Sequence, residues 1–341
     1  MKVHYLLFIL ILATTGCEST TDEDSITEFG RVFVSSNTQA KISVFDFSDT
    51  NNISSVDFIT TTSDADGIYY HRDRDVVYLA DREYNRVNAF AKFSRNEKDS
   101  GILPDVIGNS DFSNPRGLTS DGNIAIVVQD ASDSNGQQDG LFMYDVSPAS
   151  ITLRNSYTVD FSLWDIQLVG NILYAVEDES DSLAVFNNFL GNTDGLIEPD
   201  FKIRISGIER THGLHYSLSS DIMIMTDIGD ADPSIQDGEI RIIKDFSLKL
   251  SAALQTPGNT ISSTDQIIIS GSNTLLRNPV DVVYHEQANR IIVAENASNG
   301  GMILSFELPE SIDQTNSFNN SPDFMDNFPG VSGLFISSID N

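Results

Sequence analysis

The feature that most constrains this chain is a pattern repeated along its length. The stretch VVYLADREYNRVNAF, residues 76–90, shows the unit: an apolar run, an acidic residue, a polar turn and a second alternating run. The acidic position recurs at intervals of 49, 48, 49 and 68 residues, and a serine occupies it 45 residues before the first acid. These positions are Ser36, Asp81, Asp130, Asp178, Asp227 and Glu295. The chain therefore contains six units, the last step carrying an insertion around residues 247–273.

Each unit predicts strands rather than helices. Short β-branched runs alternate and are broken by Gly, Asn, Asp and Pro. One run precedes the acidic position, as in GIYYH and GLHYS; another follows it, as in RVNAF and MILSF; a weaker run, such as SVDFITT, comes last. Four strands in roughly 45 residues are the signature of a propeller blade. The sequence predicts an all-β, six-bladed β-propeller over residues 30–341.

The first unit lacks its first strand. Counting back from Ser36 reaches only polar residues, whereas GVSGLFISS, Gly330–Ser338, matches the opening of a unit. We expect this C-terminal strand to complete the first blade and to close the ring. Closure would leave no long exposed sheet edge.

Three stretches carry a family resemblance. LPDVIGNSDFSNPRGLTSDGN, LADREYNRVNAF and NPVDVVYHEQANRIIVAEN resemble NHL-repeat propellers, within the TolB-like and lactonase-like propeller superfamily. The resemblance covers about residues 30–341 and is most specific in the second, third and sixth units. It implies a six-bladed ring. It fixes no activity, because such propellers serve as binding platforms, lactonases, lyases and sensors.

The N-terminus predicts a lipoprotein signal. Lys2 precedes an apolar run, Tyr5–Ala13, which is too short to span a bilayer by the roughly 20-residue rule. Small residues then lead into Cys17, as in a bacterial lipobox. We expect a signal peptide over residues 1–16, lipid on Cys17 and a polar tether over residues 17–29. The alternative is an ordinary signal peptide with an incidental cysteine.

Cysteine content and charge limit the disulfides, the binding partners and the cellular location that we expect. Cys17 is the only cysteine, so no structural disulfide can form within the chain. The chain has 50 acidic and 20 basic residues, which should repel nucleic acid and anionic lipid and could attract cations or a basic partner. We expect a monomer of the bacterial cell envelope, most simply the outer membrane, touching the membrane only through its lipid.

The first strand of each blade should line a central channel, and the residues entering these strands should ring its mouth. They are Asp66, Arg116, Trp164, His212, Val280 and Ser332. The next position is glycine in three units but aspartate at Asp165 and Asp281. Charged side chains can orient a ligand, and an aromatic ring can stack on it. The mixture therefore predicts a ligand site made of Asp66, Arg116, Trp164, Asp165, His212 and Asp281. The alternative is that unlike side chains simply fill the mouth and that Trp164 packs between blades.

Two acidic loops on the same face suggest calcium. DASDSNGQQDG offers Asp130, Asp133, Asn135 and Asp139, and DIGDADPSIQDGE offers Asp227, Asp230, Asp232, Asp237 and Glu239. Closely spaced carboxylate and amide oxygens can supply the six to eight ligands that calcium prefers. Neither loop has the EF-hand pattern. The alternative is a pair of solvated hairpins, in which Asp, Asn and Gly are the usual turn residues.

Two functions from different classes remain open. The first is a non-catalytic binding platform that presents one propeller face to a peptide, glycan or protein. The second is a calcium-dependent hydrolase or lactonase, with His212 or Asp281 moving protons at the channel mouth. The sequence has no Gly-x-Ser-x-Gly elbow, no Walker loop and no clustered zinc ligands. Convergence of Asp66, Asp165, His212 and Asp281 on one spot would favour the enzyme. Pairing with Arg116 or with backbone amides would favour the platform.

Overall fold

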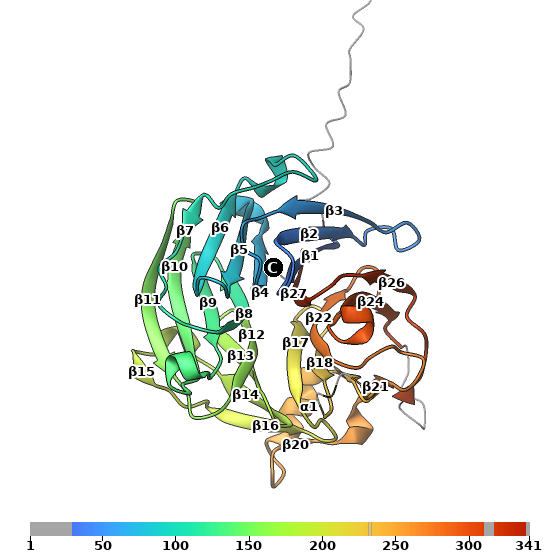
Figure 1. Ribbon diagram of the computed structural model, residues 1–341. Coiled ribbons are helices and arrows are strands. Elements are labelled where there is room, and N and C mark those ends of the chain that lie inside the picture. The colour runs from blue at the N-terminus through green and yellow to red at the C-terminus, as the bar shows by residue number, and fades with distance from the viewer. Residues whose placement is uncertain (1–28, 231, 233, 310–316, 339–341) are drawn as a thin grey trace, which may run out of the picture.

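A computed structural model describes residues 29–230, 232, 234–309 and 317–338. The predicted signal peptide, Cys17 and nearly all of the predicted tether lie outside the described residues. The described chain forms six sheets arranged as blades around a central axis, running from blue through green and yellow to red in Figure 1. The all-β six-bladed propeller predicted from the repeat is confirmed. No helix in these ranges is long and apolar enough to cross a membrane.

Each blade has four antiparallel strands, ordered from the axis outward. Sheet A contains β27 (Val331–Ile336), β1 (Arg31–Ser36), β2 (Lys41–Asp46) and β3 (Ser54–Ile59). Sheet B contains β4 (Ala65–His71), β5 (Val76–Asp81), β6 (Arg86–Ala91) and β7 (Val106–Ile107). Sheet C contains β8 (Pro115–Asp121), β9 (Ile124–Gln129), β10 (Gly140–Ser147) and β11 (Ser150–Thr158).

The second half of the ring repeats the same order. Sheet D contains β12 (Leu163–Val169), β13 (Ile172–Glu177), β14 (Ser182–Phe186) and β16 (Phe201–Ile205). Sheet E contains β17 (Thr211–Ser217), β18 (Ile222–Asp227), β19 (Glu239–Lys244) and β21 (Ile267–Ser270). Sheet F contains β22 (Pro279–His285), β23 (Arg290–Glu295), β24 (Met302–Glu307) and β26 (Phe324–Asn327).

Three short strands extend the outer edges of sheets C, D and E. They are β15 (Gly195–Leu196), β20 (Thr260–Ile261) and β25 (Ser317–Phe318). Each pairs in parallel with the outermost strand of one blade but belongs, in the sequence, to the blade that follows. The insertion predicted between the fifth and sixth acidic positions contains helix α1 (Phe246–Ala253) and β20. Phe246 and Ala253 are buried in the core between sheets D and E.

The ring closes between the two ends of the described chain. Strand β27 pairs with β1 in antiparallel register, with Val32 opposite Ile336, Phe33 opposite Phe335 and Val34 opposite Leu334. The predicted completion of the first blade by the C-terminal strand is therefore confirmed. Closure gives every innermost strand a neighbour in the blades on both sides.

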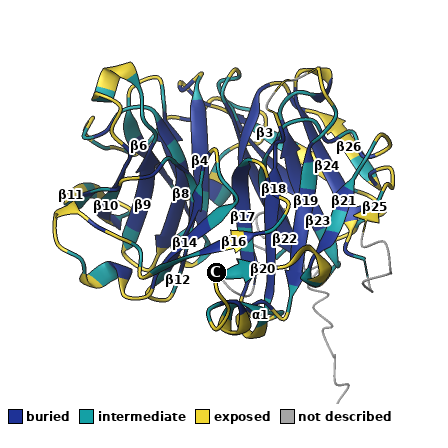
Figure 2. Cartoon of the chain, turned by 90° about the horizontal axis from the view of Figure 1, so that it is seen from below, coloured by how far each residue is buried: buried dark blue, intermediate teal, exposed yellow. Residues whose placement is uncertain are grey.

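Strand alternation explains how each sheet buries both faces. Successive residues of a strand point to opposite sides. In β5, Val77 and Leu79 pack toward sheet A, whereas Val76, Tyr78 and Ala80 pack toward sheet C. Six apolar clusters result, one between each pair of neighbouring sheets. In Figure 2 the strands are mainly buried and exposed residues gather in the loops at their ends.

Replacing Phe33 should show how strongly the closing blade holds the ring. Phe33 is fully buried and stacks on Tyr70 with ring centroids 4.3 Å apart. Phe33→Ala should lower the free energy of unfolding by about 3–5 kcal/mol, because it leaves a cavity between sheets A and B. Urea unfolding followed by circular dichroism measures this change. Leu103→Ala, at a side chain that is 72% exposed, is the control and should change the value by less than about 0.5 kcal/mol. Equal losses of unfolding free energy in the two variants would contradict the placement of Phe33 in the core between sheets A and B.

Candidate functional site

The predicted site residues lie on β-bulges. In all five inner strands from β4 to β22 the pairing with the next strand shifts register at the same point. The shifts bracket Asp66, Arg116, Trp164–Asp165, His212 and Val280. A bulge leaves extra residues outside the ladder and redirects their side chains. The repeated bulge is therefore what turns these residues toward the channel.

Three of the predicted mouth residues form one stack. The Trp164 ring lies parallel to the His212 ring, with centroids 3.7 Å apart and an interplanar angle of 7°. The Arg116 guanidinium covers the Trp164 ring, 3.9 Å from its centroid. These residues come from β8, β12 and β17, so the stack joins three successive blades. Both faces of the tryptophan are covered by protein groups rather than open for a ligand to stack on.

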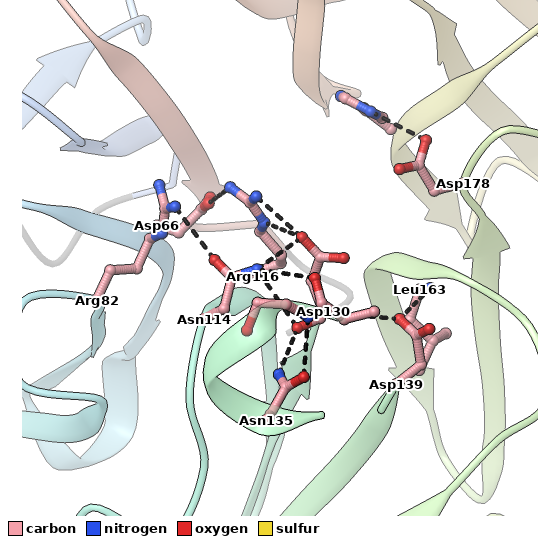
Figure 3. Close-up of polar contacts among 12 residues, drawn as sticks. Asp66, Arg82, Asn114, Arg116, Asp130, Asn135, Asp139, Leu163 and Asp178 are labelled. Carbon is pink, nitrogen blue, oxygen red and sulfur yellow. Dashed lines mark hydrogen bonds and ion pairs between the residues drawn. The ribbon is translucent and has the colours of Figure 1, made fainter. Parts of the chain in front are cut away.

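Arg116 is held by carboxylates on two blades. Its Nη2 lies 2.9 Å from an Asp130 oxygen, and its Nη1 lies 3.4 Å from an Asp66 oxygen. Figure 3 shows the guanidinium between these acids, with Asn114 and Asn135 beside Asp130. Asn114 donates to the Asp130 carboxylate at 2.9 Å, and Asn135 donates to its main-chain oxygen at 2.8 Å. The arginine therefore serves as a cross-link between blades.

The other end of the stack is anchored by Asp178. Arg210 donates two hydrogen bonds to this carboxylate, at 2.7 and 2.9 Å, and His212 Nε2 lies 3.2 Å from it. Burial disfavours ionisation of Asp178, but the bonds from His212 and Arg210 hold its pKa well below the usual range. Burial also lowers the pKa of His212, so the neutral imidazole donates a hydrogen bond and Arg210 supplies the charge. His212 is thus oriented by the ion pair between the buried Asp178 and the half-buried Arg210.

Below the stack lies a cavity of about 400 Å³. Asp66, Trp164, Val280 and Ser332 line its near end. At the far end it is bordered by Asp121 and Leu218, both exposed, in the hairpins that follow the inner strands. His71, the last residue of inner strand β4, also lies on this far side. The cavity therefore opens on the face opposite the mouth where we expected access.

Asp165 and Asp281 line this cavity, and each bonds to backbone of its own and the following blade. Asp165 accepts from Ile166 N at 2.8 Å and from Leu214 N at 3.4 Å. Asp281 accepts from Val282 N at 2.7 Å and from Leu334 N at 2.6 Å. Burial raises the pKa of Asp165 to about 7; burial, and then the charge of Asp165, raises that of Asp281 well above its usual range.

The glycines at the equivalent positions permit close approach of the inner strands. A Cβ on Gly213 would lie 2.6 Å from the Asp281 Cα, and a Cβ on Gly117 would meet the Asp165 carboxylate. The inner strands of neighbouring blades therefore lie in close contact at these positions. A side chain at either position would push two blades apart.

In two units the recurring acidic residue accepts hydrogen bonds from the loop that enters the inner strand. Glu295 accepts hydrogen bonds from the backbone of Arg277 and Asn278, 18 and 17 residues earlier. Asp227 accepts from Glu209 and Arg210 with the same two separations. The acid thus ties the loop that enters an inner strand to the end of the second strand. The acid makes this contact in the fifth and sixth units, whereas Asp130 and Asp178 bind arginine side chains instead.

The predicted calcium ligands make other contacts. Asp130 binds Arg116, Asp139 accepts from the backbone of Ala131 and Leu163, and Asp237 accepts from Asp230 N. Asp133, Asp232 and Glu239 bind Gln137, Ser234 and Arg241, respectively. Within the described ranges, no three or more His, Cys, Asp or Glu side chains are gathered to hold a metal ion. The calcium site stays a prediction without a preformed cage.

The four residues whose convergence would favour an enzyme each bind another group of the protein. Asp66 pairs with Arg116, Asp165 and Asp281 accept backbone amides, and His212 pairs with Asp178. Asp66, Asp165 and Asp281 line one cavity, whereas His212 lies outside that lining, between Trp164 and Asp178. Asp178 and Arg210 were not among the predicted site residues, although they hold His212 in place. The acidic repeat contained Asp178, but the pattern did not show that it would face an arginine from the next blade.

Other cross-blade bonds were also missed. Thr119 accepts from Leu168 N at 3.1 Å, and Gln167 bonds at both ends to the backbone of Tyr216, at 2.6 and 3.0 Å. Each partner lies 49 residues further along the chain. This separation equals the repeat length, so a search for polar residues on inner strands at that spacing would have suggested them.

Comparison with known proteins supports the fold alone. No protein-family model matches this chain, and no curated protein matches it. It is similar to a chain from the crystal structure of a nidogen/laminin complex, at 12% sequence identity and a TM-score of 0.58. The match covers 90% of this chain and 97% of that one. The chain is therefore a six-bladed β-propeller whose resemblance to NHL repeats remains a resemblance.

Removing the Asp178 charge should destabilise the protein in a pH-dependent way. The folded-state pKa lies below the unfolded value of about 3.9, so the ion pair stabilises above about pH 4 and its contribution is lost as pH falls. Asp178→Asn should cost about 2–3 kcal/mol at pH 7 and much less near pH 2.5. Urea unfolding at both pH values measures the deficit. Asp133→Asn is the matched control, and a deficit that does not depend on pH would contradict the assignment.

Asp281→Asn should show the opposite trend. The raised folded-state pKa means that ionising Asp281 costs stability as pH rises above about 4. The amide loses one backbone hydrogen bond at every pH but removes this ionisation cost. Its deficit relative to the wild type should therefore shrink between pH 4 and pH 8. Urea unfolding across this range measures it, and a deficit that grows with pH would show that the buried pair is not what we infer.

Proposed function

We propose that this chain is a non-catalytic binding platform for a peptide, glycan or protein partner. The observation that carries the proposal is that two of the predicted mouth side chains capable of acid–base chemistry, Asp66 and His212, are bonded to other groups of the protein. Asp66, Asp178 and His212 are held in ion pairs and hydrogen bonds, and the stack on Trp164 lies across the mouth. Such a mouth is a rigid centre for a binding face.

The binding face consists of the loops that enter the inner strands and the loops between the second and third strands of each blade. We call it the entry face. Its exposed charges include Glu83, Asp133, Asp160, Glu179, Glu209, Asp230 and Asp232. Arginines on the same face are paired, Arg82 with Asp64 at 3.4 Å and Arg210 with Asp178 at 2.7 Å. This balance favours a basic peptide or protein over an acidic one.

The similar solved chain comes from a nidogen/laminin complex. That likeness adds a precedent for a propeller found in a complex between proteins. We further propose that the protein is tethered to the bacterial cell envelope, most simply the outer membrane, through lipid on Cys17. Labelled palmitate and a Cys17→Ala variant test this anchor: lipid incorporation should occur in the wild type and be absent from the variant.

The calcium-dependent hydrolase receives less support. His212 is 3% exposed and bonded to Asp178, while Asp281 is bonded to two backbone amides. The described residues contain no group of three or more His, Cys, Asp or Glu side chains that could hold a metal ion beside either of them. Titration with calcium, with magnesium as control, and assays with lactones and esters test this alternative. Turnover that is lost in His212→Ala would overturn the platform.

Charge substitutions on the entry face test the platform directly. The purified protein is applied to arrays of peptides and glycans, and affinities for the bound sequences are then measured. We expect binding to Lys- and Arg-rich peptides. The triple variant Glu83→Gln, Asp133→Asn and Glu179→Gln should weaken it about tenfold, and rising salt should reduce the difference.

The matched control places the same charge change on the opposite face. The triple variant Asp49→Asn, Glu97→Gln and Glu198→Gln changes three exposed acids in loops at the other ends of the strands. It should bind as the wild type does. Equal losses in the two variants would mean that only net charge matters, and no binding to any array element would remove support for the entry face.

A further inference from the structure

The cavity that opens on the face opposite the entry face carries a separate inference. It lies along the axis of the ring and is lined by the inner strands of sheets A to F. Its volume of about 400 Å³ falls within the range of pockets that enclose small organic molecules. The entry-face proposal does not use it.

Two carboxyl groups in this cavity lack a cationic partner among the described residues. Each oxygen of Asp165 and of Asp281 accepts one backbone N–H, and each oxygen can accept a second bond. Arg116, the basic group at the near end, is taken up by Asp66 and Asp130. Both side chains are half-buried, so their carboxylates lose part of their hydration without gaining a counter-charge, and a cation in the cavity would offset that cost.

The rest of the wall mixes polar side chains with apolar and aromatic ones. Arg72 lines the cavity as well, and its guanidinium lies 3.8 Å from the Asp73 carboxylate. Tyr69 and Phe335 line the cavity with ring centroids 4.3 Å apart, and Leu168, Val283 and Ile336 line it as well. Ring faces attract organic cations, and aliphatic side chains accept their hydrocarbon parts. Asp121 stands exposed at the opening, where its charge would attract a cation toward the cavity.

The lining suits an organic cation better than a bare metal ion. Calcium needs six to eight oxygen ligands, and the described residues hold no group of three or more metal-ligating side chains. An ammonium group needs only two or three acceptors and can bring an apolar portion with it. We propose that the axial cavity binds a small organic ammonium compound, its nitrogen between Asp165 and Asp281 and its apolar portion against Tyr69 and Phe335.

The wild-type protein contains its own reporter for this site. Trp164 is the only tryptophan and lines the cavity. Titration with 2-phenylethylammonium should give a saturable change in its fluorescence. The neutral isostere 2-phenylethanol should bind at least tenfold more weakly. Equal responses to the two compounds, or no saturable response to the ammonium at millimolar concentration, would overturn the proposal without any variant.

Variants assign the charge to its residues. Asp165→Asn and Asp281→Asn should each weaken binding of 2-phenylethylammonium at least tenfold, whereas Asp133→Asn should leave it unchanged. Calorimetry in buffers of different ionisation enthalpy should show proton release on binding, which a purely apolar ligand would not cause. Unchanged affinity in folded Asp281→Asn, or tight calcium binding that displaces the ammonium, would overturn the assignment.

The tests of ammonium binding in the cavity and of peptide binding on the entry face can fail independently. The entry-face triple variant should keep full ammonium binding, and Asp281→Asn should keep full binding to basic peptides. Failure of the fluorescence titration would leave the peptide measurements intact, and failure of the arrays would leave the titration intact. Loss of both activities in either variant would show that the two sites are not independent.

Discussion

The pairing of β1 with β27 is the interaction on which the rest of the structure depends. Each sheet has two apolar faces, and each needs a neighbouring sheet to cover it. Without the contact between Phe33 and Phe335, sheet A would be incomplete, and the clusters on its two sides would lose a wall. Stability of every blade is therefore linked to a strand contributed by the end of the chain.

Contacts between inner strands at the axis of the ring also hold neighbouring blades together. Inner strands approach so closely that glycine is required at some positions, as at Gly117 and Gly213. Where aspartate replaces glycine, its carboxylate reaches backbone amides of the following blade. The same two acids then face a cavity without a counter-charge. One substitution within the repeat thus supplies both a link between blades and the negative wall of a pocket.

Sequence reasoning recovered the fold because strand alternation and the spacing of one acidic residue are local signals. It placed Asp66, Trp164, Asp165 and Asp281 at the channel, where they line the cavity. It could not tell which end of the channel opens, since that depends on the stack of Arg116, Trp164 and His212, made by three blades. Nor could it foresee the bulges, because a bulge is a relation between two strands and leaves no fixed mark in either one.

The three short parallel strands at the rim have a directional consequence. β15, β20 and β25 are each supplied by one blade to the edge of the blade before it, so sheets C, D and E have their outer hydrogen-bonding groups partly covered. Among the described residues, sheets A, B and F have no such added strand, apart from one bridge between Ile59 and Gly101 on sheet A. The rim of this ring is consequently asymmetric: the backbone of its outer edge is more open on one half of the ring than on the other.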